Sequence, residues 1–324
     1  MTYVALRTAS PGNDELMIRR LDGSSEIFLG VDADRRQHLL LPSDGQVPEI
    51  RVATLKVALR DLYVGGRTTR FIDIECVLEA LEEVFEHFVL AVSHQLEVDR
   101  SSPARVVEQV LDRWQLFLSG DGPPPSRDML AALFGEMLLL LDIVRADARR
   151  RTDVWGGPFG SRHDFRRGPL AMEVKVTRSH TSRVVTIHGD DQLESPEGGA
   201  LFLHFVRLEE SAQAGRSIPS VVDELLALGV NTESLFTSLT RSGVNIGQLG
   251  LLSDIGFEVR ERLTFPVDDS MPRIISSSYK NEARPLGVID VRYQVDLDHA
   301  LEHALDMVGY MDIVNGLATG ESDG

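Results

Sequence analysis

The chain has 324 residues and a formal net charge of −17, with 43% hydrophobic and 26% charged residues. This composition is that of an ordinary soluble protein long enough for more than one domain, and the negative charge argues against a protein that coats nucleic acid indiscriminately. The longest apolar run, residues 137–141, is too short to span a bilayer, and the N-terminus lacks the pattern of a signal peptide. Cys76 is the single cysteine, which excludes disulfides within the chain and cysteine-based metal sites, so we expect a cytoplasmic protein.

The first part of the chain predicts strands followed by helices. Residues 1–75 alternate β-favouring runs with Gly- and Asp-containing turns. Apolar residues at helical spacing predict a helix over 73–95, and Ser-Ser-Pro predicts the start of a second helix over 103–118. The Gly- and Pro-rich segment 119–125 then predicts a domain boundary.

After this boundary, Ser126 can cap a helix that runs to about residue 149. The elements expected next are strands at 163–167, 170–177, 183–188 and 200–208, helices at 217–229 and 232–242, strands at 256–266 and 287–295, and a helix from Asp296. The tail 320–324 is expected to be disordered. We therefore expect three regions: a β-rich and helical region at 1–120, a core at 121–215 and an α+β region at 216–324.

Cationic residues gather in one stretch of this acidic chain, between residues 145 and 183. They are Arg145, Arg149, Arg150, Arg151, Arg162, Arg166, Arg167, Lys175, Arg178 and Arg183. A local basic stretch indicates focused contact with an anionic ligand, and a solvated arginine-rich surface is the alternative.

Glu136 lies on the helix predicted after Ser126. Its neighbours three and four residues away, Ala132, Leu133, Leu139 and Leu140, are all apolar. The helix is apolar nearly all round, which predicts that it is buried with one carboxylate inside an apolar patch. A buried carboxylate must be paired, protonated or bound to a cation. Pairing with a nearby arginine is the structural alternative to a functional role.

The segment after Arg162 reads as a β-hairpin with Gly168 and Pro169 as its turn residues. Counting outward from this turn places Asp164 opposite Glu173, where the Cβ atoms of directly opposed residues are about 5 Å apart. Lys175 shares the face of Glu173 because side chains alternate along a strand. Two opposed carboxylates beside a lysine suit a divalent cation such as Mg²⁺ or Mn²⁺. An exposed Glu-x-Lys salt bridge is the plainer interpretation.

A helix glutamate, an aspartate on one strand and Glu-x-Lys on the next resemble the PD-(D/E)xK nuclease superfamily, which has the restriction-endonuclease-like fold. More narrowly, the chain is similar to a bacterial family assigned to this superfamily, through the segments 133–136, 155–159, 163–165, 172–178, 185–189 and 192–193. His163 stands where the family name expects proline, a residue that is often absent. The resemblance implies an α/β (α+β) chain with an αβββ(α)β core at 121–215 and elaborations on both sides.

The resemblance also implies roles for individual residues. Asp164 and Glu173 would coordinate Mg²⁺ (or Mn²⁺), and Glu136 would complete the acidic cluster. Lys175 would position the attacking water and stabilise developing charge, and Gln192 would match a glutamine that some relatives place after the third strand. Arg178 and Arg183, beyond the catalytic strand, are candidates for contact with substrate phosphates, with surface arginines as the alternative.

We therefore expect a metal-dependent DNA phosphodiesterase, an endonuclease of a restriction or phage-defence system. The alternatives are a non-catalytic DNA-binding or assembly subunit with the same fold, and a nuclease that acts on RNA. Relatives in prokaryotic defence loci imply methyltransferase or helicase-like partner proteins. A second copy of the chain, in a homodimer, is a further candidate partner, because double-strand cutting often requires two active sites. No membrane partner is expected.

Overall fold

The computed structural model describes Tyr3, Leu6, Pro11, Val52 and residues 15–21, 27–43, 45–49, 54–78, 81–99, 101–118, 125–211, 215–280 and 284–319. These residues fall into two compact units, one drawn from Met1–Pro123 with Asn245–Gly250 and the other from Pro124–Val244 with Leu251–Gly324. Residues 119–124 of the predicted break at 119–125, and the predicted tail at 320–324, lie outside the described residues. Within the described part of the chain, no helix has both the length and the apolar character needed to cross a membrane.

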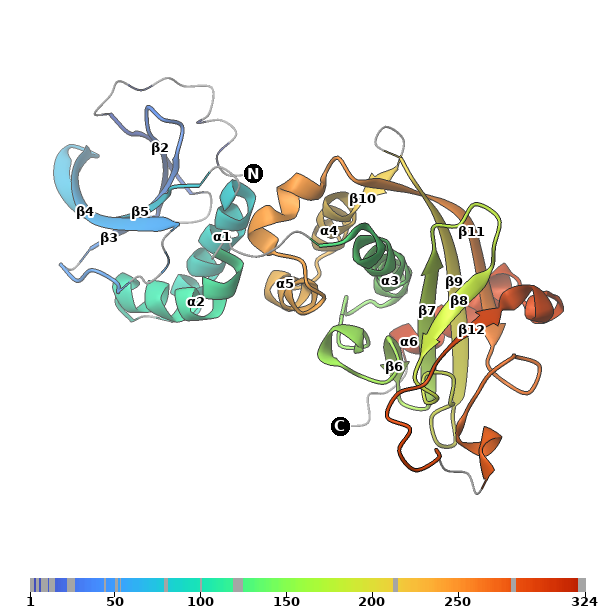
Figure 1. Ribbon diagram of the computed structural model, residues 1–324. Helices are drawn as coiled ribbons and strands as arrows, with labels where there is room; N and C mark the ends of the chain where they lie inside the picture. The colour runs from blue at the N-terminus through green and yellow to red at the C-terminus, as the bar shows by residue number, and fades with distance from the viewer. Residues whose placement is uncertain are drawn as a thin grey trace. The chain divides into compact units, whose positions relative to one another are not determined.

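The first unit is built on an antiparallel sheet with the strand order β1-β2-β3-β5-β4. Its elements are β1 (Met17–Arg20), β2 (Phe28–Val31), β3 (Gln37–Pro42), β4 (Leu55–Val64), β5 (Arg67–Cys76), α1 (Glu82–Val98) and α2 (Pro103–Leu118). The helices α1 and α2 pack against each other beside this sheet (Figure 1). The helix predicted over 73–95 begins later than expected, because Asp73 continues β5 between the buried Ile72 and Ile74. Pairing with β3 on one side and β4 on the other makes this segment a strand.

The second unit is built on a mixed sheet with the strand order β10-β11-β9-β7-β6. The strands are β6 (Phe165–Arg167), β7 (Leu170–Thr177), β9 (Ala200–Glu210), β10 (Arg216–Ser217) and β11 (Gly256–Pro266). β6 and β7 form the predicted hairpin, in which Arg167 pairs with Leu170 and Phe165 with Met172. Gly168 has a φ of 55°, a conformation that favours glycine at this turn. β7 then pairs with β9 in parallel.

Helices cover one face of this sheet and a two-stranded ribbon covers the other (Figure 1). The helices of the unit are α3 (Arg127–Ala146), α4 (Ile218–Ala227), α5 (Thr232–Arg241) and α6 (Met307–Thr319), with the 3-10 helices η2 (Gly157–Phe159), η4 (Ser276–Ser278) and η6 (Leu297–His303). A further 3-10 helix, η3 (Ile246–Leu252), follows α5. The ribbon consists of β8 (Val184–His188) and β12 (Arg292–Asp296). Apolar side chains from the ribbon, β7 and β9 form one core cluster, with Val185, Ile187, Ala171, Leu203 and Phe205 among its members.

The chain is therefore a mixed α+β protein, as the sequence predicts. The predicted boundary at 120/121 lies close to the boundary between the two units. The predicted boundary at 215/216 does not separate compact units, because β10 and β11 come from the C-terminal region and join the sheet that holds β7. The helix expected from Asp296 is the 3-10 helix η6 followed by α6.

Candidate active site

The strand β7 presents two different faces, as alternation of its side chains requires. Val174 and Val176 face helix α3, which approaches them closely because residue 135 is glycine. A Cβ on Gly135 would lie 2.4 Å from Cγ2 of Val176. Glu173 and Lys175 point to the opposite face, toward the ribbon of β8 and β12.

Glu173 is buried, with only 2% of its side chain exposed, and its Oε1 lies 2.8 Å from Nζ of Lys175. The other oxygen, Oε2, is buried without a hydrogen-bond partner among the described residues. Nζ of Lys175 also donates a hydrogen bond of 3.0 Å to Oε1 of Gln192, which in turn accepts from the backbone N–H of His188 at 2.9 Å. Gln192, in the segment after β8, therefore fixes the position of the lysine ammonium group.

Asp164 occupies an open edge of β7. The strand β6 pairs only with residues 170–172, so beyond Met172 this edge has no strand partner among the residues that the structure describes. The N–H of Val174 at this edge donates instead to Oδ2 of Asp164 at 2.8 Å. The backbone carbonyl of Asp164 accepts from the N–H groups of Gly156 and Gly157 at 2.9 and 3.0 Å. The carboxylate is thus held against the strand, and its backbone is held by the loop that precedes it.

That loop also reaches Glu136 on α3. The indole Nε1–H of Trp155 donates a hydrogen bond of 2.7 Å to Oε2 of Glu136. Gly157 separates Glu136 from Asp164, because a Cβ there would lie 3.2 Å from Oε2 of Glu136 and 3.0 Å from Oδ1 of Asp164. Glycine leaves the space between the two carboxylates open.

Glu136, Asp164 and Glu173 form an acidic cluster, which we call the carboxylate cluster. Glu173 is buried, and Glu136 and Asp164 are half-buried. Burial raises the pKa of Glu173 to about 8, with the charge of Asp164 as the next cause. Burial and then the charge of Asp164 likewise raise the pKa of Glu136 to about 8. Burial also raises the pKa of Asp164. Since Lys175 supplies one positive charge, ionising the whole cluster requires further positive charge.

The carboxylate cluster fits a divalent cation in its chemistry. Its donors are hard oxygen atoms of the kind that Mg²⁺ and Mn²⁺ prefer, and Oε2 of Glu173 is a buried donor without a partner among the described residues. The side chains are not arranged around one metal position, since among the described residues no three His, Cys, Asp or Glu side chains converge on such a point. The ion pair to Lys175 and the hydrogen bond from Val174 hold one oxygen of Glu173 and one of Asp164.

The five predicted residues Glu136, Asp164, Glu173, Lys175 and Gln192 are linked by the contacts above. Arg178 and Arg183 are not part of this arrangement. Arg178 forms ion pairs with Asp128 and Glu210 at 3.1 and 3.2 Å. Arg183 forms ion pairs with Glu261 and Asp298 at 2.6 and 2.7 Å. Because acidic side chains already engage both guanidinium groups, we do not include them in the site.

Trp155 and Gly157 contact the carboxylate cluster, although the residue patterns alone assign them no role. The signal for Trp155 is that a buried tryptophan, here 1% exposed, needs an acceptor for its indole N–H. The signal for Gly157 is a run of glycines in a loop directly before the hairpin. His163, at the position of the family proline, is buried, and its Nε2 lies 3.1 Å from the carbonyl oxygen of Glu194.

A helix glutamate, an aspartate at an open strand edge and a Glu-x-Lys strand on one mixed sheet define the PD-(D/E)XK class of fold. The family model described as "Putative PD-(D/E)XK family member, (DUF4420)" matches residues 1–298, and the chain belongs to this family. No match was found among curated proteins or among solved structures.

Proposed function

We propose that the protein is a metal-dependent DNA phosphodiesterase that cuts within the strand. The observation that carries this proposal is the state of Glu173. Its carboxylate is buried beside Lys175 with one oxygen lacking a partner among the described residues, next to Asp164 and Glu136. Such a group destabilises the fold unless a cation or a proton joins it, so its retention is best explained by ligand binding.

Asp164, Glu173 and Glu136 would hold Mg²⁺ or Mn²⁺. A bound divalent cation offsets charge on phosphoryl oxygens and lowers the pKa of water, which is the chemistry that phosphodiester hydrolysis needs. Asp164 keeps its orientation through the N–H of Val174, which occupies one of its oxygens and leaves the other, Oδ1, facing Gly157.

Lys175 contributes a fixed positive charge beside the carboxylate cluster. Its ammonium group has three N–H donors, of which contacts to Glu173 and Gln192 use two. The third is free to donate to an attacking water or to a phosphoryl oxygen, where developing negative charge strengthens the interaction. Gln192 keeps the ammonium group oriented because its own oxygen is anchored by the backbone of His188.

A non-catalytic subunit with the same fold is the second candidate. The ion pair between Glu173 and Lys175 favours it, because this contact satisfies part of the charge without a metal. The resemblance to families in defence loci supports a role in restriction or phage defence, with methyltransferase or helicase-like proteins as partners.

Cleavage of supercoiled plasmid, methylated and unmethylated, tests the proposal in Mg²⁺, Mn²⁺ or EDTA. We expect metal-dependent nicking by the wild type that is lost in Asp164→Asn and Lys175→Met. The control is Glu197→Gln, which changes an exposed carboxylate of the same unit and should cut like the wild type. Cleavage that persists in both site variants would assign the activity to another site. If no form cuts DNA or RNA, calorimetry with Mn²⁺ separates the two candidates: binding that Asp164→Asn abolishes supports an enzyme that awaits a partner, and absence of binding supports the non-catalytic subunit.

A further inference from the structure

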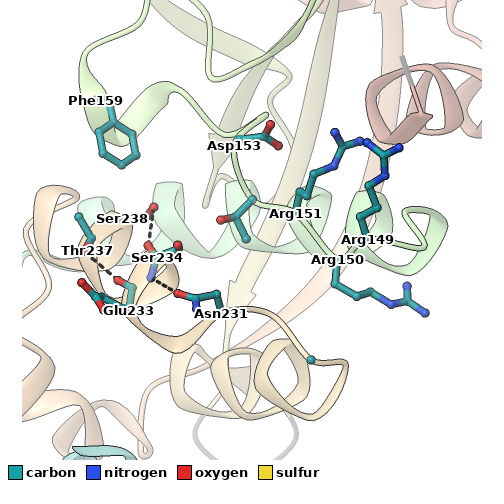
Figure 2. A pocket seen from close by; sticks show the side chains of 12 residues that line it. Arg149, Arg150, Arg151, Asp153, Phe159, Asn231, Glu233, Ser234, Thr237 and Ser238 are labelled. Atoms are coloured by element: carbon teal, nitrogen blue, oxygen red, sulfur yellow. Dashed lines mark hydrogen bonds between the residues drawn. The ribbon is translucent and has the colours of Figure 1, made fainter. Parts of the chain in front are cut away.

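A second feature of this unit lies against the loop that contacts the carboxylate cluster. It is a pocket of about 740 Å³ between residues 149–159 and the turn and helix at 229–238. Figure 2 shows three consecutive arginines to one side of it, Phe159 to the other, and side chains of α5 below. The pocket belongs to the second unit alone. The roles proposed above leave it unused.

The loop at 155–160 connects this pocket with the carboxylate cluster. Trp155 and Gly157 face Glu136. Gly157 begins the 3-10 helix η2, and Phe159, two residues later in that helix, lines the pocket. This 3-10 helix, η2, packs against α5. A group bound at Phe159 would therefore contact the same loop that contacts the carboxylate cluster, two residues after Gly157.

Phe159 has the properties of a stacking platform. Its side chain is 51% exposed, which is unusual for a large apolar residue that lines a pocket. The guanidinium carbon of Arg241 lies 4.9 Å from the centre of its ring. Aromatic rings backed by arginine, beside further positive charge, are the elements with which proteins hold the unpaired bases of single strands.

The positive charge comes from Arg149, Arg150 and Arg151. Two of these guanidinium groups have structural partners: Arg150 donates to the carbonyls of Val144 and Arg145, and Arg151 pairs with Asp147 at 3.0 Å. The guanidinium of Arg149 has no hydrogen-bond or ion-pair partner among the described residues and is exposed. It is the cation of this group that is available to a ligand.

Two acidic residues also line the pocket. Asp153 is paired with Arg167 at 2.8 Å, so its charge is offset. Glu233 lies in the first turn of α5, where the helix dipole favours a negative charge. Arg241, against the ring of Phe159, adds another positive charge. The net charge of the side chains at the pocket is therefore positive, although the chain as a whole has a net charge of −17. This local balance favours an anionic ligand over a cationic one.

We propose that this pocket binds one unpaired nucleotide of the nucleic acid substrate, with its base stacked on Phe159 and its phosphate at Arg149. The inference rests on the proposed function, because it assigns the nucleotide to the strand that enters the carboxylate cluster. It specifies the substrate as nucleic acid with a single-stranded or extruded nucleotide beside the cleavage point.

Binding in EDTA tests this inference without any need for cleavage. The probe is a fluorescein-labelled single-stranded oligodeoxynucleotide, compared with the duplex of the same sequence by fluorescence anisotropy. Phe159→Ala should weaken binding of the single strand at least about fivefold, the low end of the range for loss of one stacked base, and should affect the duplex less. Phe159→Trp keeps a stacking surface and should restore wild-type affinity.

Arg149→Ala should lower the salt dependence of binding, with the slope of log Kd against log salt falling by about 0.7, as for one phosphate contact on a single strand. Arg292→Ala removes an exposed charge elsewhere in the same unit and serves as the matched control. Wild-type affinity in Phe159→Ala, or an equal loss in Arg292→Ala and Arg149→Ala, overturns the inference. The proposed nuclease activity would survive that result if plasmid nicking still depends on Asp164. Conversely, weakened binding in Phe159→Ala by a protein that neither cuts nucleic acid nor binds Mn²⁺ would support the pocket and contradict the proposed function.

Discussion

Replacing Glu173 with glutamine should stabilise the metal-free protein, and increasingly so as the pH rises. The pKa of this carboxyl group rises from its ordinary value of 4.5 to about 8 in the fold, mainly through burial. Between these values the folded state keeps a proton that the unfolded chain releases, so the free energy of unfolding falls as pH rises. Below about pH 4.5 both states are protonated and the cost vanishes, whereas above about pH 8 it is complete.

The size of the effect follows from the interval between the two pKa values, which is 8 − 4.5 = 3.5. At about 1.4 kcal/mol for each pH unit, the whole interval corresponds to about 5 kcal/mol. The charge of the neighbouring Asp164 contributes to this shift, so we assign a little under half of the interval, roughly 2 kcal/mol, to Glu173→Gln at pH 8. In a unit of this size, that raises the Tm by about 4–8 °C.

The change in Tm can be measured by thermal unfolding in EDTA, from pH 5 to pH 8.5, followed by circular dichroism. The gain in Tm of Glu173→Gln over the wild type should be small at pH 5 and largest at pH 8 to 8.5, and added Mg²⁺ should stabilise the wild type but not Glu173→Gln. Glu197→Gln, at an exposed position, should show no pH-dependent gain. A gain that is independent of pH, or a lower Tm of Glu173→Gln at pH 8, would refute the reasoning from burial.

Three further outcomes are expected. Gly157→Ala places a methyl group 3.2 Å from Oε2 of Glu136 and should lower the rate of metal-dependent nicking at least about tenfold, with an unchanged circular dichroism spectrum. Gln192→Leu removes the acceptor that orients Lys175 and should lower kcat more than it raises KM, a split that steady-state kinetics on a short duplex measures; equal changes in both would argue against an orienting role. Arg183→Ala should leave DNA affinity and its salt dependence unchanged while costing roughly 1 kcal/mol of stability in urea denaturation, because the side chain serves ion pairs within the fold.

The order of elements around the site could be predicted from the sequence because local patterns determine it. The Gly168-Pro169 turn and the alternation after Leu170 are sufficient to give the register that the structure shows. The helix that carries Glu136 is buried over most of its length, as its apolar pattern predicts, while the Glu136 side chain itself is half-buried. Each of these inferences depends on residues a few positions apart.

Contacts between distant segments could not be predicted in this way. Arg183 looks like a free cation in the sequence, and its partner Glu261 lies 78 residues away. The hydrogen bond from Trp155 to Glu136 depends on how a loop folds back onto α3. The helix predicted from Asp73 is displaced for a similar reason, because pairing with β3 and β4 extends β5 to Cys76. Tertiary pairing overrides local propensity in each case.

The β6–β7 hairpin, which carries Glu173, is held in place by hydrogen bonding to the helix α6. Nε of Arg167 donates a buried hydrogen bond of 2.6 Å to the carbonyl of Leu317, 150 residues later, and Arg151 reaches the carbonyl of Ala318 at 3.1 Å. During synthesis, α3 and the hairpin therefore leave the ribosome long before the helix that anchors them. In the proposed nuclease, each molecule would therefore gain its anchored hairpin only after α6 has been translated.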